Sequence, residues 1–233
     1  MAMKRLLGLL ITTIFCLFAV YAGDVAVFVD LGFSEDGETY FFGQYGRKDK
    51  TFEAYAEIYT VDVEDNDFVK NGIFKSSSGS TTKGSALFKE LQEKHSSFFD
   101  KFNICPSNSE KLLYLRADSE ESEIKEIKFK DFESSTDGKS FFYNVRLMPL
   151  YEGKGETTKS SFYIVVEKSD EEGNILSKNV IGNPDIKRKG VTGYKIDRIF
   201  TNSNGTGFVF LVEKTITDST GISIRYMVET AEF

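Results

Sequence analysis

The chain has 233 residues, of which 36 are acidic and 29 are basic, so its formal net charge is −7. An acidic chain lacks the basic face that nucleic acids and anionic lipid surfaces require, so we expect no nucleic acid as a partner. The core is predicted to be aromatic, because the chain contains 22 Phe and 11 Tyr but no Trp.

The first 22 residues have the pattern of a secretory signal peptide. Lys4 and Arg5 form a positively charged start, residues 6–20 are almost all apolar, and Val20-Tyr21-Ala22 fits a cleavage site before Gly23. The apolar run is shorter than the roughly 20 residues that span a bilayer. We therefore expect a cleavable signal and a secreted or periplasmic protein, with an uncleaved membrane anchor as the alternative.

The predicted domains are a signal peptide over residues 1–22 and a single secreted β-rich domain over residues 23–233. The formal net charge of the mature chain would be −9, because the removed segment carries two basic residues and no acidic residue. Cys16 would leave with the signal, so Cys105 would be the single cysteine and no internal disulfide could form. We expect no stable membrane insertion of the mature chain.

The first part of the mature chain alternates as β-strands do. In residues 55–63, Tyr55 and Tyr59 point to one face while Ala56 and Ile58 point to the other. Strands are predicted over residues 24–31, 39–45, 55–63 and 68–74, with polar turns at residues 34–37 and 64–67 and a polar loop at residues 46–50.

Residues 85–103 are predicted to form one amphipathic helix. Its apolar residues, which include Leu87, Phe88 and Leu91, recur at the helical period and form one narrow face. Ser85 is the expected N-cap, and it follows a flexible loop rich in Ser, Thr and Gly over residues 75–83. Because the polar face carries both signs of charge, we expect the helix to pack on the sheet rather than on a membrane.

The rest of the chain is predicted to form hairpins. Residues 111–116 fit a strand or a short helix, and residues 145–151 either continue the sheet or leave it at Pro149. Further strands are predicted over residues 124–132, 161–168, 174–181, 194–200, 208–216 and 222–229. The predicted fold class is mainly β, with antiparallel hairpins in a bent-sheet or irregular propeller-like arrangement and one helix near residues 85–103.

A turn that leads into an aromatic strand occurs three times. Each copy has Asp or Asn, then Gly, then aromatic residues three and five positions after the Gly. Asp and Asn favour tight turns because they hydrogen-bond to the local backbone, and Gly accepts a positive φ. The turns are Asp36-Gly37, Asp137-Gly138 and Asn204-Gly205, and the aromatic pairs are Tyr40 and Phe42, Phe141 and Tyr143, and Phe208 and Phe210. We interpret the motif as structural.

The first copy resembles the repeat of TolB-type β-propellers, in which a Ser-Pro-Asp-Gly turn leads into a strand and then into an Ile-Tyr-Val-x-Asp strand. Residues 34–37 read Ser-Glu-Asp-Gly here, with Glu35 in place of Pro, and residues 58–62 read Ile-Tyr-Thr-Val-Asp. Residues 162–168 also resemble residues 208–214, 46 positions later, which is near the period of a propeller blade.

The chain as a whole resembles a family of predicted secreted proteins of unknown function, domain of unknown function 2259, which is found in spirochaetes and proteobacteria. The resemblance is carried by residues 29–63 and by Ile224-Arg225-Tyr226-Met227-Val228-Glu229-Thr230. It covers most of the mature chain and implies export and a β fold. It implies no activity.

Residue types that carry catalysis or bind metals are few. His95 is the single histidine and lies in the apolar register of the helix, while Cys105 has no flanking Cys or His. One His and one Cys cannot supply a zinc site, and the acidic turn over residues 62–67 lacks the Gly and the distal Glu of an EF-hand loop. We therefore expect no metal and no cofactor.

Four tyrosines, Tyr40, Tyr45, Tyr55 and Tyr59, are many aromatic residues for one region of sheet. Core packing explains most of them, but part of the set could form a binding surface for an envelope protein or a glycan. The favoured hypothesis is a non-catalytic binding or interaction module, which predicts an exposed aromatic patch and no convergent polar cleft. The alternative is a carboxylate-dependent envelope hydrolase, which predicts two acidic side chains in a deep pocket, one with a raised pKa.

Overall fold

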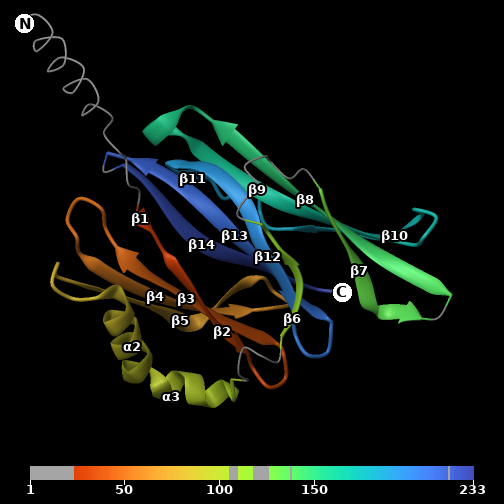
Figure 1. Cartoon of the computed structure of the whole chain (residues 1–233), viewed down its shortest axis with the longest axis horizontal. Helices are drawn as coiled ribbons and strands as arrows, with labels where there is room; N and C mark the ends of the chain where they lie inside the picture. The colour runs from red at the N-terminus through yellow and green to blue at the C-terminus, as the bar shows by residue number, and fades with distance from the viewer. Residues whose placement is uncertain (1–23, 105–109, 118–125, 137, 220) are drawn as a thin grey trace, which may run out of the picture.

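The structure is a computed structural model, and it describes residues 24–104, 110–117, 126–136, 138–219 and 221–233 (Figure 1). The predicted signal peptide, Cys105 and Asp137 lie outside the described residues. In the part of the chain that is described, no helix is both long and apolar enough to cross a membrane.

The strands form three sheets, which we call the helix-side sheet, the central sheet and the far sheet. The helix-side sheet has the order β2 (Val27–Phe33), β3 (Thr39–Arg47), β4 (Ala54–Asp62) and β5 (Asp67–Ser78). The central sheet has the order β1 (Asp24–Val25), β14 (Gly221–Glu232), β13 (Gly207–Asp218), β12 (Val191–Thr201) and β6 (Lys111–Leu115). The far sheet has the order β10 (Ile175–Ile181), β9 (Lys159–Ser169), β8 (Lys139–Glu152) and β7 (Ile127–Thr136), and β11 (Arg188–Lys189) pairs with β9. Paired strands are antiparallel, except that β1 runs parallel to β14.

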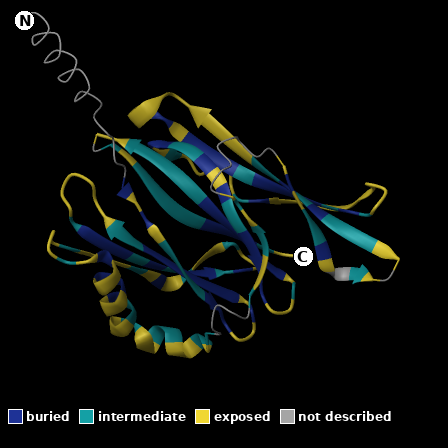
Figure 2. Ribbon diagram, viewed as in Figure 1, coloured by how far each residue is buried: buried dark blue, intermediate teal, exposed yellow. Residues whose placement is uncertain are grey.

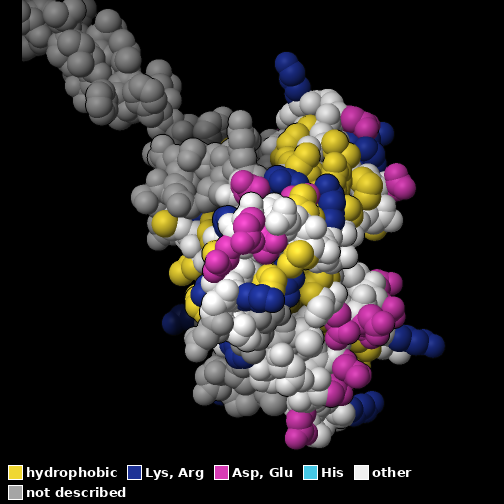
Figure 3. Space-filling view, turned by 90° about the vertical axis from the view of Figure 1, so that its right-hand side faces the viewer, with side chains coloured by type: hydrophobic (Ala, Val, Ile, Leu, Met, Phe, Trp, Pro, Cys, Tyr) yellow, Lys and Arg dark blue, Asp and Glu magenta, His cyan; other side chains and the backbone are white. Residues whose placement is uncertain are grey.

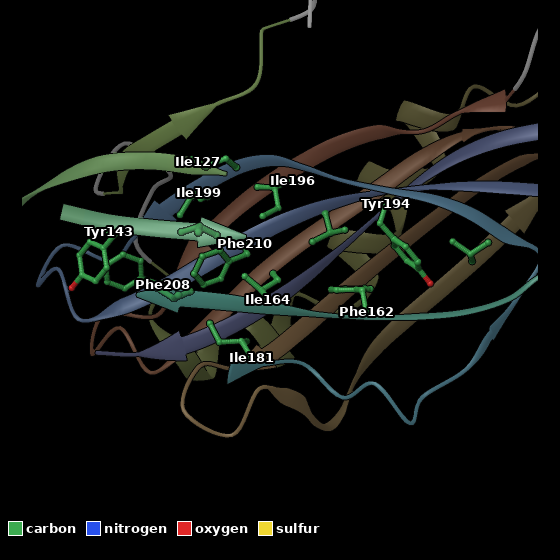
Figure 4. Close-up of a cluster of buried hydrophobic side chains, with 14 residues drawn as sticks. Ile127, Tyr143, Phe162, Ile164, Ile181, Tyr194, Ile196, Ile199, Phe208 and Phe210 are labelled. Carbon is green, nitrogen blue, oxygen red and sulfur yellow. The ribbon is translucent and has the colours of Figure 1, made fainter. Parts of the chain in front are cut away.

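The central sheet lies between the other two sheets, so both of its faces are buried (Figure 1). Along β13, Phe208 and Phe210 pack toward the far sheet, whereas Val209 and Leu211 pack toward the helix-side sheet. Figure 4 shows the first of these cores, in which Phe162 and Ile164 of β9 point toward the central sheet and Phe162 lies by Tyr194 of β12. Burial on both faces explains why this strand is apolar at successive positions rather than alternating.

The helix-side sheet is also covered on both faces. Tyr40 and Phe42 of β3 pack against the central sheet, while Phe41 between them faces the helices. The helix α2 (Gly84–Lys94) places Leu87, Phe88 and Leu91 on Ala54, Ala56 and Ile58 of β4. The predicted packing of an apolar helix face on the sheet is therefore confirmed, and Figure 2 shows buried residues along these strands.

The helix predicted over residues 85–103 is divided. α2 ends at Lys94, and the chain continues as α3 (Ser96–Phe99) and the 3₁₀ helix η1 (Asp100–Phe102). The break falls at His95, whose ring stacks on Phe74 with the ring centres 4.0 Å apart. After the break, Phe99 and Phe102 set their edges against Phe41, with ring centres at 6.1 and 5.2 Å.

The N-cap of α2 is Lys83 rather than the predicted Ser85, and no side chain caps the helix start. Gly84 occupies the first helical position because the helix approaches β3 closely there. A Cβ at this position would lie 2.8 Å from the carbonyl oxygen of Gly46.

The strand predicted over residues 24–31 is wrong as a single strand, because β1 belongs to the central sheet and β2 to the helix-side sheet. The other predicted strands are present in the described residues, which exclude residues 124 and 125, and two segments are more regular than predicted. β5 continues through Ser78, so the first four of the nine residues in the loop predicted over residues 75–83 are strand, paired with β4 as far as Ala54. β8 does not leave the sheet at Pro149, which lies opposite Phe162 of β9. Proline is tolerated there because β7 pairs only as far as Val145, so that edge of β8 needs no N–H donor.

The fold is mainly β, antiparallel and built of bent sheets with short helices, as predicted. The helix-side sheet and the far sheet each contain four consecutive strands, as a propeller blade does, but they stack on the two faces of the central sheet. The central sheet combines β1 and β6 with β12 to β14, so it joins strands from the start, the middle and the end of the described chain. The short 3₁₀ helix η3 (Gly155–Thr157) links β8 to β9.

Candidate functional site

The four tyrosines predicted as a binding surface do not lie on one surface. Tyr40 is 0% exposed and Tyr55 is 7% exposed, while Tyr45 and Tyr59 are half-buried. Tyr40 and Tyr55 are therefore wrong as members of an exposed surface, because both face the central sheet. Their hydroxyls donate to Asp30 at 3.0 Å and to Asp24 at 3.2 Å.

The two half-buried tyrosines also have partners within the fold. The Tyr45 ring packs on Phe88 of α2, with ring centres 5.5 Å apart. The Tyr59 hydroxyl donates to the Glu57 carboxylate at 2.7 Å. A binding role for Tyr45 and Tyr59 stays a prediction.

The repeated turns contain glycines in the left-handed region, with φ of 79° at Gly37, 86° at Gly138 and 77° at Gly205. The carboxylate of Asp36 accepts hydrogen bonds from the Ser34 hydroxyl and from the Glu38 N–H, and these bonds lower the pKa of Asp36. Asn204 is exposed in the third turn, and Asp137 of the second lies outside the described residues. The structure thus shows the Asp36 carboxylate bonded within its own turn.

The first and third copies of the turn lie side by side. The Asn202 side chain donates to the Gly37 carbonyl at 3.5 Å and accepts from Gly207 N–H at 3.2 Å. The aromatic pairs that follow are stacked in a similar way, with ring centres 6.2 Å apart for Tyr40 and Phe42 and 6.4 Å apart for Phe208 and Phe210. The Asn202 hydrogen bond to Gly37 joins the helix-side sheet to the central sheet, whereas each aromatic pair stacks within its own strand.

The acidic turn over residues 62–67 forms the β4–β5 hairpin. The Asp62 carboxylate accepts from Asp65 N–H at 3.0 Å, and the Asp67 carboxylate accepts from Phe68 N–H at 2.7 Å. Within the described ranges, no group of three or more His, Cys, Asp or Glu side chains is placed to hold a metal ion.

A cleft of about 450 Å³ lies where the three sheets meet, and we call it the three-sheet cleft. Its walls come from three segments that are far apart in the sequence. Val61, Asp65, Asn66, Asp67 and Phe68 belong to the β4–β5 hairpin, Gly182, Asn183, Ile186 and Arg188 to the connection from β10 to β11, and Met227, Val228 and Glu229 to β14.

A chain of polar contacts crosses this cleft. The Asn66 side chain donates to the Glu229 carboxylate at 2.6 Å, and Arg188 Nη2 lies 3.8 Å from the other oxygen of that carboxylate. Burial raises the pKa of Glu229, although the Asn66 hydrogen bond and the Arg188 charge oppose the rise. The carboxylate of Glu229 is thus held in place between two segments that come from different sheets.

The outer edge of β14 forms part of the same cleft. β1 pairs with this edge only at Ser223 and Ile224. Further along, side-chain amides take the place of a neighbouring strand: Gln44 Oε1 accepts from Tyr226 N–H at 2.9 Å, and Asn66 Oδ1 accepts from Thr230 N–H at 2.7 Å. Since outward N–H groups alternate along an edge strand, Val228 N–H points to this edge as well.

A pair of carboxyl groups lies elsewhere, between β2 and the start of β6. Asp30 Oδ1 accepts from the Tyr40 hydroxyl and from Gly32 N–H, both at 3.0 Å. Glu110 hydrogen-bonds to Asp30, and burial together with the Asp30 charge raises the pKa of Glu110 to about 9. The raised pKa predicted for the hydrolase alternative is thus present, although neither carboxyl lines the three-sheet cleft.

One basic group is also perturbed. Lys214 of β13 is half-buried, and its burial, together with the nearby charge of Arg188, lowers the pKa of its amine to about 8.

The cleft was not found from the sequence, because its contacts span most of the chain. Asn66 and Glu229 are 163 positions apart, and each was assigned only to a turn or a strand. One signal was available: by strand alternation Glu229 shares a face with Met227 and Ala231, and an acid that is buried between apolar residues needs a partner.

Comparison with known proteins gives one match. A family model described as "Predicted secreted protein (DUF2259)" matches residues 41–232. No curated protein matches the chain, and no solved structure matches it.

Proposed function

Since the chain belongs to this family of predicted secreted proteins, we propose that it is an exported, non-catalytic binding protein whose ligand site is the three-sheet cleft. Export would use a signal peptide over residues 1–22, and residues 23–233 would form the single secreted domain. The cleft replaces the aromatic patch as the candidate site, because Tyr40 and Tyr55 are buried.

The cleft itself is the observation that supports this proposal. Its volume of about 450 Å³ is in the range of sites for small ligands and short peptide segments. Exposed apolar side chains, Phe68 at 48% and Ile186 at 52%, stand beside the polar contacts of Glu229. Apolar walls with a few fixed polar groups are the usual composition of a binding site.

The proposal is tested by affinity capture from the envelope fraction with the immobilised mature chain. Phe68→Asp places a charge on the wall of the cleft and is expected to remove the captured material. Phe52→Asp is the matched control, because Phe52 is 59% exposed in the β3–β4 turn and does not line the cleft. Equal capture by both variants and the wild type would show that the cleft is not the binding site.

The Asp30–Glu110 pair favours one alternative, a carboxylate-dependent hydrolase. Glu110, whose raised pKa keeps it protonated at neutral pH, lies beside Asp30, and two neighbouring carboxyl groups are a common arrangement for acid–base catalysis. Hydrolysis of a panel of glycoside and ester substrates would support this function if Glu110→Gln abolished it. Turnover that is unchanged in Glu110→Gln would exclude the pair as the catalyst.

A further inference from the structure

We infer that the three-sheet cleft binds an extended peptide segment with basic side chains, which adds to the free edge of β14 at Val228. This inference rests on the proposed binding function and specifies the chemistry of the ligand.

The free edge of β14 is the first reason. Gln44 and Asn66 already satisfy the outward N–H groups of Tyr226 and Thr230, the positions two before and two after Val228. Val228 itself lines the cleft, and its outward N–H and C=O are the main-chain groups between these two capped positions. A peptide residue in extended conformation offers the matching donor and acceptor, as in binding by strand addition.

The second reason is a second strand edge across the groove. An adjoining cavity of about 360 Å³ shares Asn66 and Gly182 with the three-sheet cleft. Its walls include Asn179 and Val180 of β10, and β10 pairs only with β9 in the part of the chain that is described. The groove therefore runs between two strand edges, β14 and β10, and it continues beyond Val228 in the direction of an added strand.

Charge identifies the side chains of the ligand. The three-sheet cleft has three carboxylates, Asp65, Asp67 and Glu229, and one guanidinium, Arg188. The adjoining cavity adds two more carboxylates, Glu64 and Glu232, and no basic group. Lysine or arginine side chains would complement this excess of negative charge, and their methylene stems would lie on Phe68 and Ile186.

The test uses a fluorescent ten-residue peptide of alternating lysine and threonine and measures its binding by fluorescence anisotropy. Two further peptides carry N-methyl groups on every second backbone nitrogen: one on the odd-numbered positions and the other on the even-numbered positions. A fourth peptide has glutamate in place of lysine. We expect at least a tenfold loss of affinity for one methylated register and for the glutamate peptide. Equal binding of both methylated peptides would overturn strand addition, because N-methylation removes the backbone donors and leaves the charges.

Two protein variants locate the binding. Val228→Pro removes one N–H from the free edge without removing a hydrogen bond to β13, and is expected to weaken binding at least tenfold with an unchanged circular dichroism spectrum. Asp65→Lys reverses an exposed charge and should weaken binding about fivefold, whereas the exposed Asp49, outside the cleft, serves as the control in Asp49→Lys. If Val228→Pro and Asp65→Lys both bind the peptide as the wild type does, the inference is overturned. If Val228→Pro folds poorly, Asp65→Lys still gives the test, because it alters only the surface.

The peptide assay also separates this inference from the proposed function. If no peptide binds but capture of envelope material still depends on Phe68, the peptide inference fails and the binding function stands. If Phe68→Asp has no effect on capture and no peptide binds, both fail.

Discussion

Replacing Glu110 with glutamine is expected to change how the stability of the fold depends on pH. In the folded chain the pKa of Glu110 is raised to about 9, from an ordinary value of 4.5, so the folded state holds a proton that the unfolded chain releases near pH 4.5. The resulting stabilisation is complete below pH 4.5 and is lost as the pH rises toward 9. Glutamine stays neutral and can still donate to Asp30, so Glu110→Gln should not show this loss.

The size of the effect follows from the shift and from the position of the side chain. One pKa unit corresponds to about 1.4 kcal/mol, but Glu110 is only half-buried, and solvent screening reduces the full value. The compared quantity is the free energy of unfolding of Glu110→Gln minus that of the wild type at the same pH. We expect this difference to be about 2 kcal/mol larger at pH 9 than at pH 5.

Urea unfolding of both proteins at pH 5, 7 and 9 measures this difference, and other titrating groups cancel in the comparison. Glu90→Gln is the control, because Glu90 is exposed on α2. Parallel pH profiles for the wild type and Glu110→Gln would refute the raised pKa of Glu110.

Three further predictions concern the cleft, the helix and the buried amine. Asn66→Asp replaces the donor to Glu229 with a carboxylate and should destabilise the fold by about 2 kcal/mol at pH 7, and by less at pH 5, in urea unfolding. Gly43→Ala would place a Cβ 2.3 Å from the Phe88 ring and should cost about 3 kcal/mol by thermal unfolding, whereas Gly79→Ala, with nothing within 4 Å, should cost little. Lys214→Met should raise the free energy of unfolding by about 1 kcal/mol at pH 7, and this gain should shrink as the pH rises from 8 toward 10.5, because the wild-type amine then loses its proton in the folded state first.

Periodicity predicted most strands well because they have at least one buried face, although β10 was also predicted and is exposed at six of its seven residues. It failed where a tertiary contact decided the outcome. His95 falls in the helical register, but α2 ends just before it and its ring stacks on Phe74, a contact that the pattern of apolar residues does not contain. The Ser-rich end of β5 has the composition of a loop, yet it pairs with β4, so backbone hydrogen bonds to β4 outweigh its low strand propensity.

The burial of Tyr40 and Tyr55 could not be predicted from alternation alone. Alternation shows that two residues share a face, but it does not show whether a second layer covers that face. Here the central sheet covers one face of the helix-side sheet and α2 covers the other. An aromatic strand between two layers is core on both sides, so a high aromatic content was evidence for layers rather than for an exposed surface.

The edge of β14 shows how a structural need and a binding site can share residues. An unpaired edge strand invites association with other chains, and proteins usually cover or block it. Here β1 covers only Ser223 and Ile224, and the amides of Gln44 and Asn66 cover two of the positions that follow. Both amides come from the helix-side sheet, so the cover is part of the rigid packing of two layers. Full protection would require a third cap at Val228, where the structure has a cleft instead, and this difference is the strongest reason to look for a ligand there.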